Sequence, residues 1–142
     1  EADCVDSVEL PEFGAVLVFS NNVGETLSKV LSESVLTIDG SKATPLPEHF
    51  YMLNNLSRLS EYNKIIASYM DGRLYLVIAQ GSSLMLCNSY VAPDFTTAEY
   101  FIFLAMKKLQ LNPEVSTICF RTPLDMDQEM SLYRYFKSVE LI

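Results

Sequence analysis

The middle of the chain shows the clearest alternation of apolar and polar positions. Two β-rich runs there are separated by only two residues, Asp71 and Gly72. Asp-Gly favours a type I′ turn, because both central residues of that turn need positive φ, so the pair predicts a β-hairpin. A second turn at Gly81 leads into a third β-rich run. We therefore expect an antiparallel meander whose strands cover 65–70, 73–79 and 84–91.

Helical spacing returns after the meander. Two capping-box patterns, in which a short polar residue is followed three positions later by Glu or Gln, predict the starts of two helices. A short β-rich run separates these helices, and another ends the chain. The boxes are Thr96 with Glu99 and Asp125 with Gln128, and the expected elements are helix 96–109, strand 116–120, helix 125–136 and strand 138–142.

The region before the meander reads as two strands, a helix, a strand and a helix. Its run 15–19 is continuously apolar, which is typical of a strand covered on both faces. Asn22 with Glu25 resembles a further capping box, and Pro47 suits the first position of a helix. The expected strands cover 4–10, 15–19 and 35–38, and the expected helices cover 22–32 and 47–62.

The element order predicts an α/β fold with a mixed sheet. After residue 64 it is β-β-β-α-β-α-β, which is the order of the ribonuclease-H-like fold that also underlies actin-like ATPases. No Pro/Gly-rich linker divides the chain, so we expect a single domain over 1–142. Within it, 63–142 is the ribonuclease-H-like unit, and 1–62 echoes the end of such a unit, as the tail of a preceding related lobe would.

Composition narrows the classes of function. Of the 142 residues, 49% are hydrophobic and 20% are charged, which is typical of a folded domain and not of a disordered chain. The formal net charge of −8 disfavours binding to nucleic acid. The longest apolar run, 100–106, is far shorter than the roughly 20 residues of a membrane-spanning helix. We expect no nucleic-acid partner and no membrane insertion.

The cysteines indicate a compartment. Cys4, Cys87 and Cys119 form an odd set without Cys-x-x-Cys spacing, and the last two lie in apolar, strand-like runs. Buried free thiols in a reducing compartment are favoured over a disulfide. The sequence also shows no basic-then-apolar leader. Both observations predict a cytoplasmic protein.

The sequence contains few residues in a pattern that would support catalysis. A two-metal nuclease needs several converging carboxylates, but the first meander strand has none in its body, and Asp71 and Glu99 are assigned to a turn and a helix cap. The Asp71-Gly72 connection is too short to wrap a phosphate, and the turn at 80–83 lies at the wrong connection for that role. His49 is the single histidine, and it is favoured as a surface or cap-proximal residue over a catalytic base. We therefore predict no catalytic, cofactor-binding or metal-binding residues, and no cofactor.

The helix expected after Thr96 is apolar all round between residues 100 and 106. A helix with one exposed face is normally amphipathic, so this one should be covered on more than one side. Burial within the chain is the favoured interpretation, and an interface with a protein partner or a second copy is the alternative. The residues expected at such an interface are Tyr100, Phe101, Phe103 and Leu104.

Several features of the second half of the chain occur together: Asn88-Ser89-Tyr90 at a strand end, the acidic, Tyr-containing segment 94–100, and the later stretches 109–111 and 135–139. In these features the chain resembles an uncharacterised Bacteroidetes family with an actin-like ATPase fold. The resemblance covers 65–142 well and 8–40 loosely. It implies a fold but no activity and no functional residues, and it implies a further lobe before Glu1.

Together these observations favour a non-catalytic binding or scaffold protein with an actin-like fold. The alternative is a divergent ATPase or phosphotransferase, using ATP and Mg²⁺, whose nucleotide site needs a missing N-terminal lobe. The sequence names neither a partner nor a biological process.

Overall fold

The computed structural model describes residues 5–20, 30, 40 and 46–142. The chain divides into two compact units, Glu1–Pro47 and Glu48–Ile142. The strand expected over 35–38 lies outside the described residues, and so does the helix expected over 22–32 except for residue 30. The prediction of one domain with an internal boundary near residue 62 stays a prediction.

The described part of the first unit is an antiparallel hairpin. Strand β1 (Val5–Leu10) pairs with β2 (Ala15–Ser20), and a short 3₁₀ turn, η1 (Pro11–Phe13), joins them. Gly14 follows that turn with a φ of 57°, a left-handed conformation that glycine adopts without strain. Exposure alternates along β2, and Val16 and Val18 are exposed. The expectation that this strand is covered on both faces is therefore wrong.

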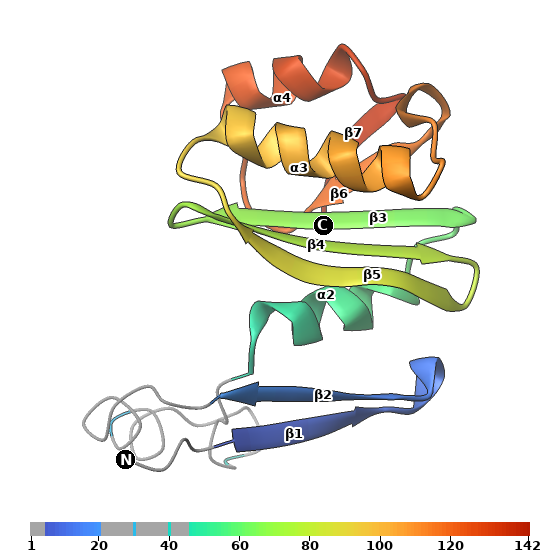
Figure 1. The fold of residues 1–142 in the computed structure, drawn as a ribbon, viewed down its shortest axis with the longest axis vertical. Helices are drawn as coiled ribbons and strands as arrows, with labels where there is room; N and C mark the ends of the chain where they lie inside the picture. The colour runs from blue at the N-terminus through green and yellow to red at the C-terminus, as the bar shows by residue number, and fades with distance from the viewer. Residues whose placement is uncertain (1–4, 21–29, 31–39, 41–45) are drawn as a thin grey trace. The chain divides into compact units, whose positions relative to one another are not determined.

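The second unit contains a five-stranded mixed sheet with the order β5-β4-β3-β6-β7. Three antiparallel strands form the predicted meander, and two strands run parallel beside β3 (Figure 1). Asp71 and Gly72 have φ values of 51° and 68°, as the predicted type I′ turn requires. The strands are β3 (Asn63–Met70), β4 (Arg73–Gln80), β5 (Ser83–Val91), β6 (Thr117–Phe120) and β7 (Ser138–Leu141).

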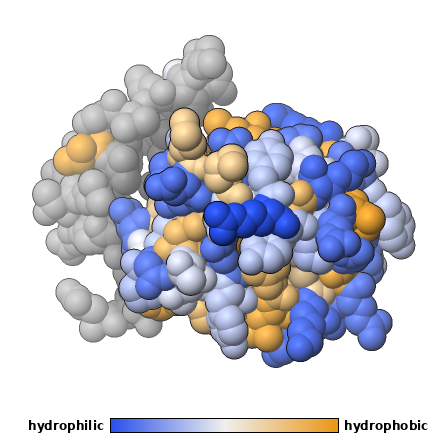
Figure 2. All heavy atoms as spheres, turned by 90° about the horizontal axis from the view of Figure 1, so that it is seen from above, coloured by the Kyte–Doolittle hydropathy of each residue, from blue (hydrophilic) through white to orange (hydrophobic). Residues whose placement is uncertain are grey.

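Helices cover both faces of this sheet. Helix α2 (Glu48–Leu56) lies on one face, while α3 (Phe95–Lys108) and α4 (Met126–Tyr133) lie on the other (Figure 1). A 3₁₀ turn, η2 (Pro113–Val115), precedes β6. The strand order and the two helical layers confirm the predicted mixed α/β fold. Figure 2 looks onto the side that carries α4 and shows hydrophobic patches among hydrophilic side chains.

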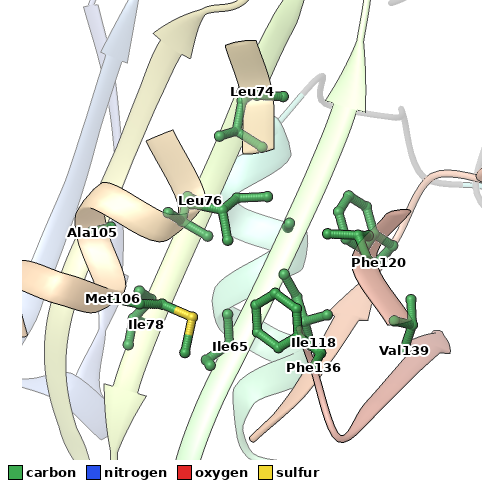
Figure 3. Close-up of a cluster of buried hydrophobic side chains, with 14 of the residues drawn as sticks. Ile65, Leu74, Leu76, Ile78, Ala105, Met106, Ile118, Phe120, Phe136 and Val139 are labelled. Atoms are coloured by element: carbon green, nitrogen blue, oxygen red, sulfur yellow. The ribbon is translucent and has the colours of Figure 1, made fainter. Parts of the chain in front are cut away.

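The main core lies between the sheet and the helices α3 and α4. Successive side chains of a strand point to opposite faces, so alternate residues of β3, β4 and β6 enter this core. They meet Ile102 and Met106 of α3 and Phe136 after α4 (Figure 3). Residues between them in sequence, such as Ile66 and Val77, are equally buried and lie on the face that α2 covers. Cover on both faces explains why these strands are nearly continuous apolar runs.

Of the two capping boxes predicted for the second unit, the structure contains one and not the other. Asp125 and Gln128 form the expected capping box, with the Gln128 amide 2.8 Å from Asp125 Oδ1. The box expected at Thr96 and Glu99 is wrong, because α3 begins at Phe95 and its N-cap lies two residues before Thr96. Its N-cap is Asp94, whose Oδ1 accepts the Thr97 amide at 2.7 Å.

Candidate functional site

The carboxyl ends of parallel strands are where open α/β sheets usually bind ligands. In this protein three aromatic side chains, Tyr69, Phe95 and Phe120, occupy that place and are called the strand-end cluster. Ring centroids lie 5.5 Å apart for Tyr69 and Phe95, and 6.3 Å apart for Phe95 and Phe120. Phe120 is only 1% exposed. These three side chains pack on one another at the ends of β3 and β6. Beside them a pocket of about 130 Å³ lies at the ends of β6 and β7, and it is lined by Phe120, Pro123, Leu124, Glu129, Val139, Glu140 and Leu141.

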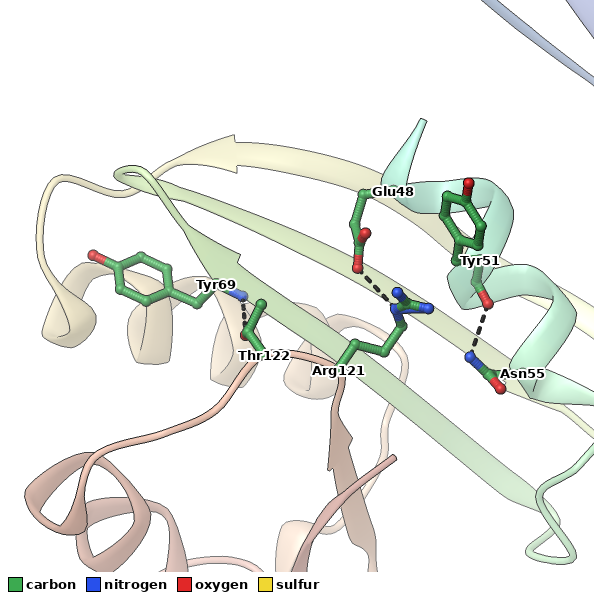
Figure 4. A network of polar contacts seen from close by, with 6 residues as sticks. All are labelled: Glu48, Tyr51, Asn55, Tyr69, Arg121 and Thr122. Carbon is green, nitrogen blue, oxygen red and sulfur yellow. Dashed lines mark hydrogen bonds and ion pairs between the residues drawn. The ribbon is translucent and has the colours of Figure 1, made fainter. Parts of the chain in front are cut away.

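Hydrogen bonds hold Tyr69 in this cluster. Its amide donates to Thr122 Oγ1 at 2.9 Å, just after β6 (Figure 4). Its hydroxyl donates to the carbonyl of Ala92 at 3.1 Å, just after β5. The Ala92 amide in turn donates to the carbonyl of Gly72 at 2.8 Å. The ends of β5 and β6 and the β3–β4 turn are therefore joined around one tyrosine.

The β3–β4 turn is as short as the sequence predicts. It contains only Asp71 and Gly72, and the Asp71 side chain is exposed. A Cβ at Gly72 would lie 3.8 Å from the Ala92 carbonyl oxygen and from Pro93 Cα, so the following loop passes close by. A turn of this size leaves few backbone amides to surround a phosphate.

A second polar group lies near the start of α2. Arg121 Nε is 2.9 Å from Glu48 Oε1, and the Arg121 guanidinium lies over the Tyr51 ring at 5.2 Å (Figure 4). His49 is the second residue of α2, close to where the sequence places it, and its ring makes an edge contact with Tyr75 at 5.3 Å. Its Nε2 is buried without a hydrogen-bond partner. This geometry is that of a packed histidine, with no nucleophile bonded to Nε2.

Among the described residues, two further buried side-chain atoms lack a hydrogen-bond partner: Ser68 Oγ and Glu99 Oε1. Glu99 lies within α3, one turn past its N-terminus, and not at the cap that the sequence suggested. Over the part of the chain that is described, no group of three or more His, Cys, Asp or Glu residues could hold a metal ion.

The described cysteines are free thiols with different surroundings. Cys119 is buried, and burial followed by the negative charges of Glu140 and Glu61 raises its pKa to about 11. Cys87 is exposed, which corrects the expectation of a buried thiol, although partial burial still raises its pKa. Thiolates are the reactive form of cysteine, so neither environment activates a nucleophile.

An apolar groove lies between β5 and α3, and it is called the edge groove. Its volume is about 230 Å³. The Tyr90 and Phe101 rings stack at 4.6 Å on its wall. Its lining residues are Leu86, Tyr90, Phe101, Leu104, Ala105, Lys108 and Leu109.

The edge groove brings together part of the predicted partner surface. Phe101 and Leu104 line it, and Tyr100 is 61% exposed beside it on α3. Phe103 points elsewhere and packs on Tyr135 and Phe136, with ring centroids 4.9 and 5.8 Å away. The expectation that this helix is covered on more than one side is thus met only in part.

Sequence reasoning missed the contributions of β5 and of the end of α3 to this groove. The spacing of Phe101, Leu104, Ala105 and Lys108 is that of one helix face, and it was the available signal. The contribution of Leu86 and Tyr90 depends on how β5 packs against α3, which no local pattern shows.

Nearly the whole chain matches a family model. The model named "Protein of unknown function (DUF3822)" covers residues 1–139. The chain belongs to the DUF3822 family. A solved structure from Bacteroides thetaiotaomicron, described as a protein with actin-like ATPase fold and unknown function, is similar over 99% of this chain, with 20% identity and a TM-score of 0.68. This similarity shows the actin-like fold, as predicted.

The DUF3822 chain spans 54% of that neighbour's length, or about half. It is also 34% identical over 87 residues to autophagy-related protein 8h of Arabidopsis thaliana, covering 56% of this chain and 72% of that protein. The family model and the solved neighbour extend over nearly the whole chain, so they decide the family and the fold. None of the described helices is both long and apolar enough to cross a bilayer.

Proposed function

We propose that this DUF3822 protein is a non-catalytic binding or scaffold protein of the cytoplasm. The observation that carries the proposal is the strand-end cluster. Tyr69, Phe95 and Phe120 pack together at the ends of β3 and β6, which is part of the edge where a sheet of this kind usually binds a substrate or nucleotide. A protein that acts by contact with other proteins does not need this part of the sheet open.

The surrounding groups support the same proposal. The β3–β4 connection is a two-residue turn, and the body of β3 contains no carboxylate. Cys119 has a raised pKa, which is the opposite of an activated nucleophile. The free thiols Cys87 and Cys119 support a reducing compartment such as the cytoplasm.

The binding surface in this proposal is the edge groove with the exposed face of α3. Tyr100, Phe101 and Leu104 present apolar and aromatic surface there. Exposed apolar patches of this kind mark contact sites on folded proteins, and aromatic residues are enriched in the centres of interfaces.

The alternative is a divergent ATPase or phosphotransferase that binds ATP and Mg²⁺ with the help of a preceding lobe. The solved neighbour is described as a protein with actin-like ATPase fold and is nearly twice as long as this chain, and both observations favour this alternative. Under it, nucleotide would approach the Asp71-Gly72 turn.

Thermal unfolding of the full-length protein with and without millimolar ATP and Mg²⁺ separates the two functions. A ligand that binds the native state raises the midpoint of unfolding, and we expect no such rise. The Asp71→Ala variant is the matched control, because Asp71 is exposed at the turn. A rise of several degrees that disappears in Asp71→Ala, or ATP hydrolysis that disappears with it, would overturn the proposed function.

A further inference from the structure

The outer side of β5 offers an unprotected sheet edge. Among the described strands, β5 pairs only with β4 and stands at the end of the sheet order. Residues 83–91 include no charged residue and no proline, the two devices with which natural edge strands commonly avoid pairing. The opposite edge, β7, is four residues long and carries Glu140. The longer and uncharged edge is thus that of β5.

One hydrogen bond shows which backbone groups face outward along β5. The Ser89 amide donates to the side-chain oxygen of its neighbour Asn88 at 2.8 Å, so this amide points to the free edge and not to β4. An Asn88 side chain that turns away would leave the Ser89 amide available to a new strand. Alternation along a strand places the outward groups of Cys87 and Val91 on the same side.

The apolar surface continues from this strand onto α3. Leu86 and Tyr90 of β5 line the edge groove together with Phe101 and Leu104. Tyr100 is exposed on the same helix. A strand added to β5 would therefore also cover apolar surface that the described residues of the second unit leave exposed.

Charge favours one particular occupant. Residues 83–108 contain two acidic residues, Asp94 and Glu99, and two basic residues, Lys107 and Lys108. Two of each sign give this segment a net charge of zero, whereas the whole chain carries −8. Two copies of this acidic chain would repel each other less through this neutral segment than through a segment with the chain's average negative charge. Asp94 lies at the start of α3 and the lysines lie in its last turn, so antiparallel α3 helices would bring opposite charges together.

We infer that the occupant is a second copy of this chain, bound by antiparallel pairing of β5 with β5 about a two-fold axis at Asn88. The two sheets then form one continuous sheet, with both α3 helices antiparallel on the same face. In this register Leu86 of each copy faces Tyr90 of the other, on the groove side. The register also keeps to the regular part of β5, because the irregularity in its pairing with β4 lies before Leu86.

Sedimentation velocity on the full-length protein tests this inference. We expect reversible dimers that increase from low to high micromolar concentration. Asn88→Lys places two like charges directly opposite each other at the axis, and we expect it to weaken the dimer roughly fivefold or more. Met126→Lys is the matched control, since Met126 is 79% exposed on α4 and the charge change is the same. A monomer at every concentration, or a dimer that Asn88→Lys leaves unchanged, would overturn the inference.

Disulfide trapping tests the register without relying on a destabilising variant. In a background with Cys4→Ser and Cys87→Ser, Asn88→Cys places two thiols at the axis, where paired Cα atoms lie about 4.5–5.5 Å apart. Met85→Cys is the control, because its two copies would lie about 20 Å apart at about 3.3 Å per residue. With diamide, which accepts the two electrons and two protons, we expect rapid covalent dimers for Asn88→Cys and slow ones for Met85→Cys. Equal rates would overturn the register.

In this inference the partner in the proposed binding role is a second copy of the chain. The functional meaning of the dimer therefore rests on the proposed function. The two can fail separately. Stabilisation by ATP would overturn the proposed function and leave the dimer standing, whereas a monomeric protein would overturn the dimer alone.

Discussion

The carboxyl ends of β3 and β6 and the free edge of β5 are built in opposite ways. At the strand ends, aromatic rings and hydrogen bonds from three segments surround Tyr69, and Phe120 is almost fully buried. At the edge, β5 leaves Met85, Cys87 and Asn88 exposed, and the described residues leave the groove beside it open.

This difference bears on function because each kind of activity needs a different kind of surface. Chemistry on a small molecule needs a concave space lined by a few polar groups. Association needs accessible apolar area and unpaired backbone groups, and β5 with α3 supplies both. The contrast between the two regions holds only if the ends of β3 and β6 are part of the packed core and the edge of β5 is not needed for folding.

The largest expected effect comes from removing the centre of the strand-end cluster. Phe120→Ala should lower the free energy of unfolding by about 3–5 kcal/mol, because it leaves a cavity in a core that cannot fully collapse. Urea unfolding followed by circular dichroism measures the loss. Val115→Ala, at a residue 68% exposed, is the control and should change it by no more than about 0.5 kcal/mol. A loss below about 1 kcal/mol for Phe120→Ala would mean that the strand ends are loosely packed.

The buried thiol of Cys119 provides a pH test of how tightly the interior of the sheet is packed. The Cys119 thiol has a pKa of 9.0 when unfolded and of about 11 when folded, so only the unfolded state ionises between these values. Its contribution to stability is therefore complete below pH 9 and falls as pH rises towards 11, by about 2–3 kcal/mol. Urea unfolding from pH 8 to 11 should show a shallower decline for Cys119→Ala than for the unchanged protein. Parallel declines in the two proteins would contradict this interpretation.

A smaller effect is expected at the turn that joins β3 to β4. Gly72 has a φ of 68°, and a Cβ added there would meet nothing closer than 3.8 Å. Gly72→Ala should therefore cost about 1–2 kcal/mol through backbone strain alone. Asp71→Gly is the control, since glycine also accepts the φ of 51° at that position, and it should change stability by no more than about 0.5 kcal/mol. An unchanged midpoint for Gly72→Ala would mean that the turn is not of type I′.

This turn also shows what local sequence can predict. The Asp-Gly pair determines a turn by its own backbone preferences, so the hairpin could be predicted without knowing the rest of the fold. The capping box at Asp125 and Gln128 is local in the same way. At Thr96 and Glu99 the pattern was misleading, because Asp94 lies earlier and its side chain reaches the Thr97 amide. A pattern match does not decide between two neighbouring caps.

Exposure could not be predicted in the same way. Cys87 and Cys119 both lie in apolar runs, yet one belongs to an edge strand and the other to a strand with neighbours on both sides. The strand-end cluster joins Tyr69, Phe95 and Phe120, which are far apart in sequence. The spacing of residues along one element contains no information about either feature, because both follow from which strands pair.

The smallest expected effect is at the open edge. Met85 is 43% exposed on β5, and Met85→Lys keeps the long aliphatic stem while the charged end can reach solvent. Measured at low protein concentration, its free energy of unfolding should differ from that of the unchanged protein by no more than about 0.5 kcal/mol. Phe120→Ala in the same experiment supplies the contrast. If Met85→Lys instead lowered the free energy of unfolding by about 2 kcal/mol or more, the edge of β5 would be part of the folded core. The contrast between an exposed edge and packed strand ends would then be wrong.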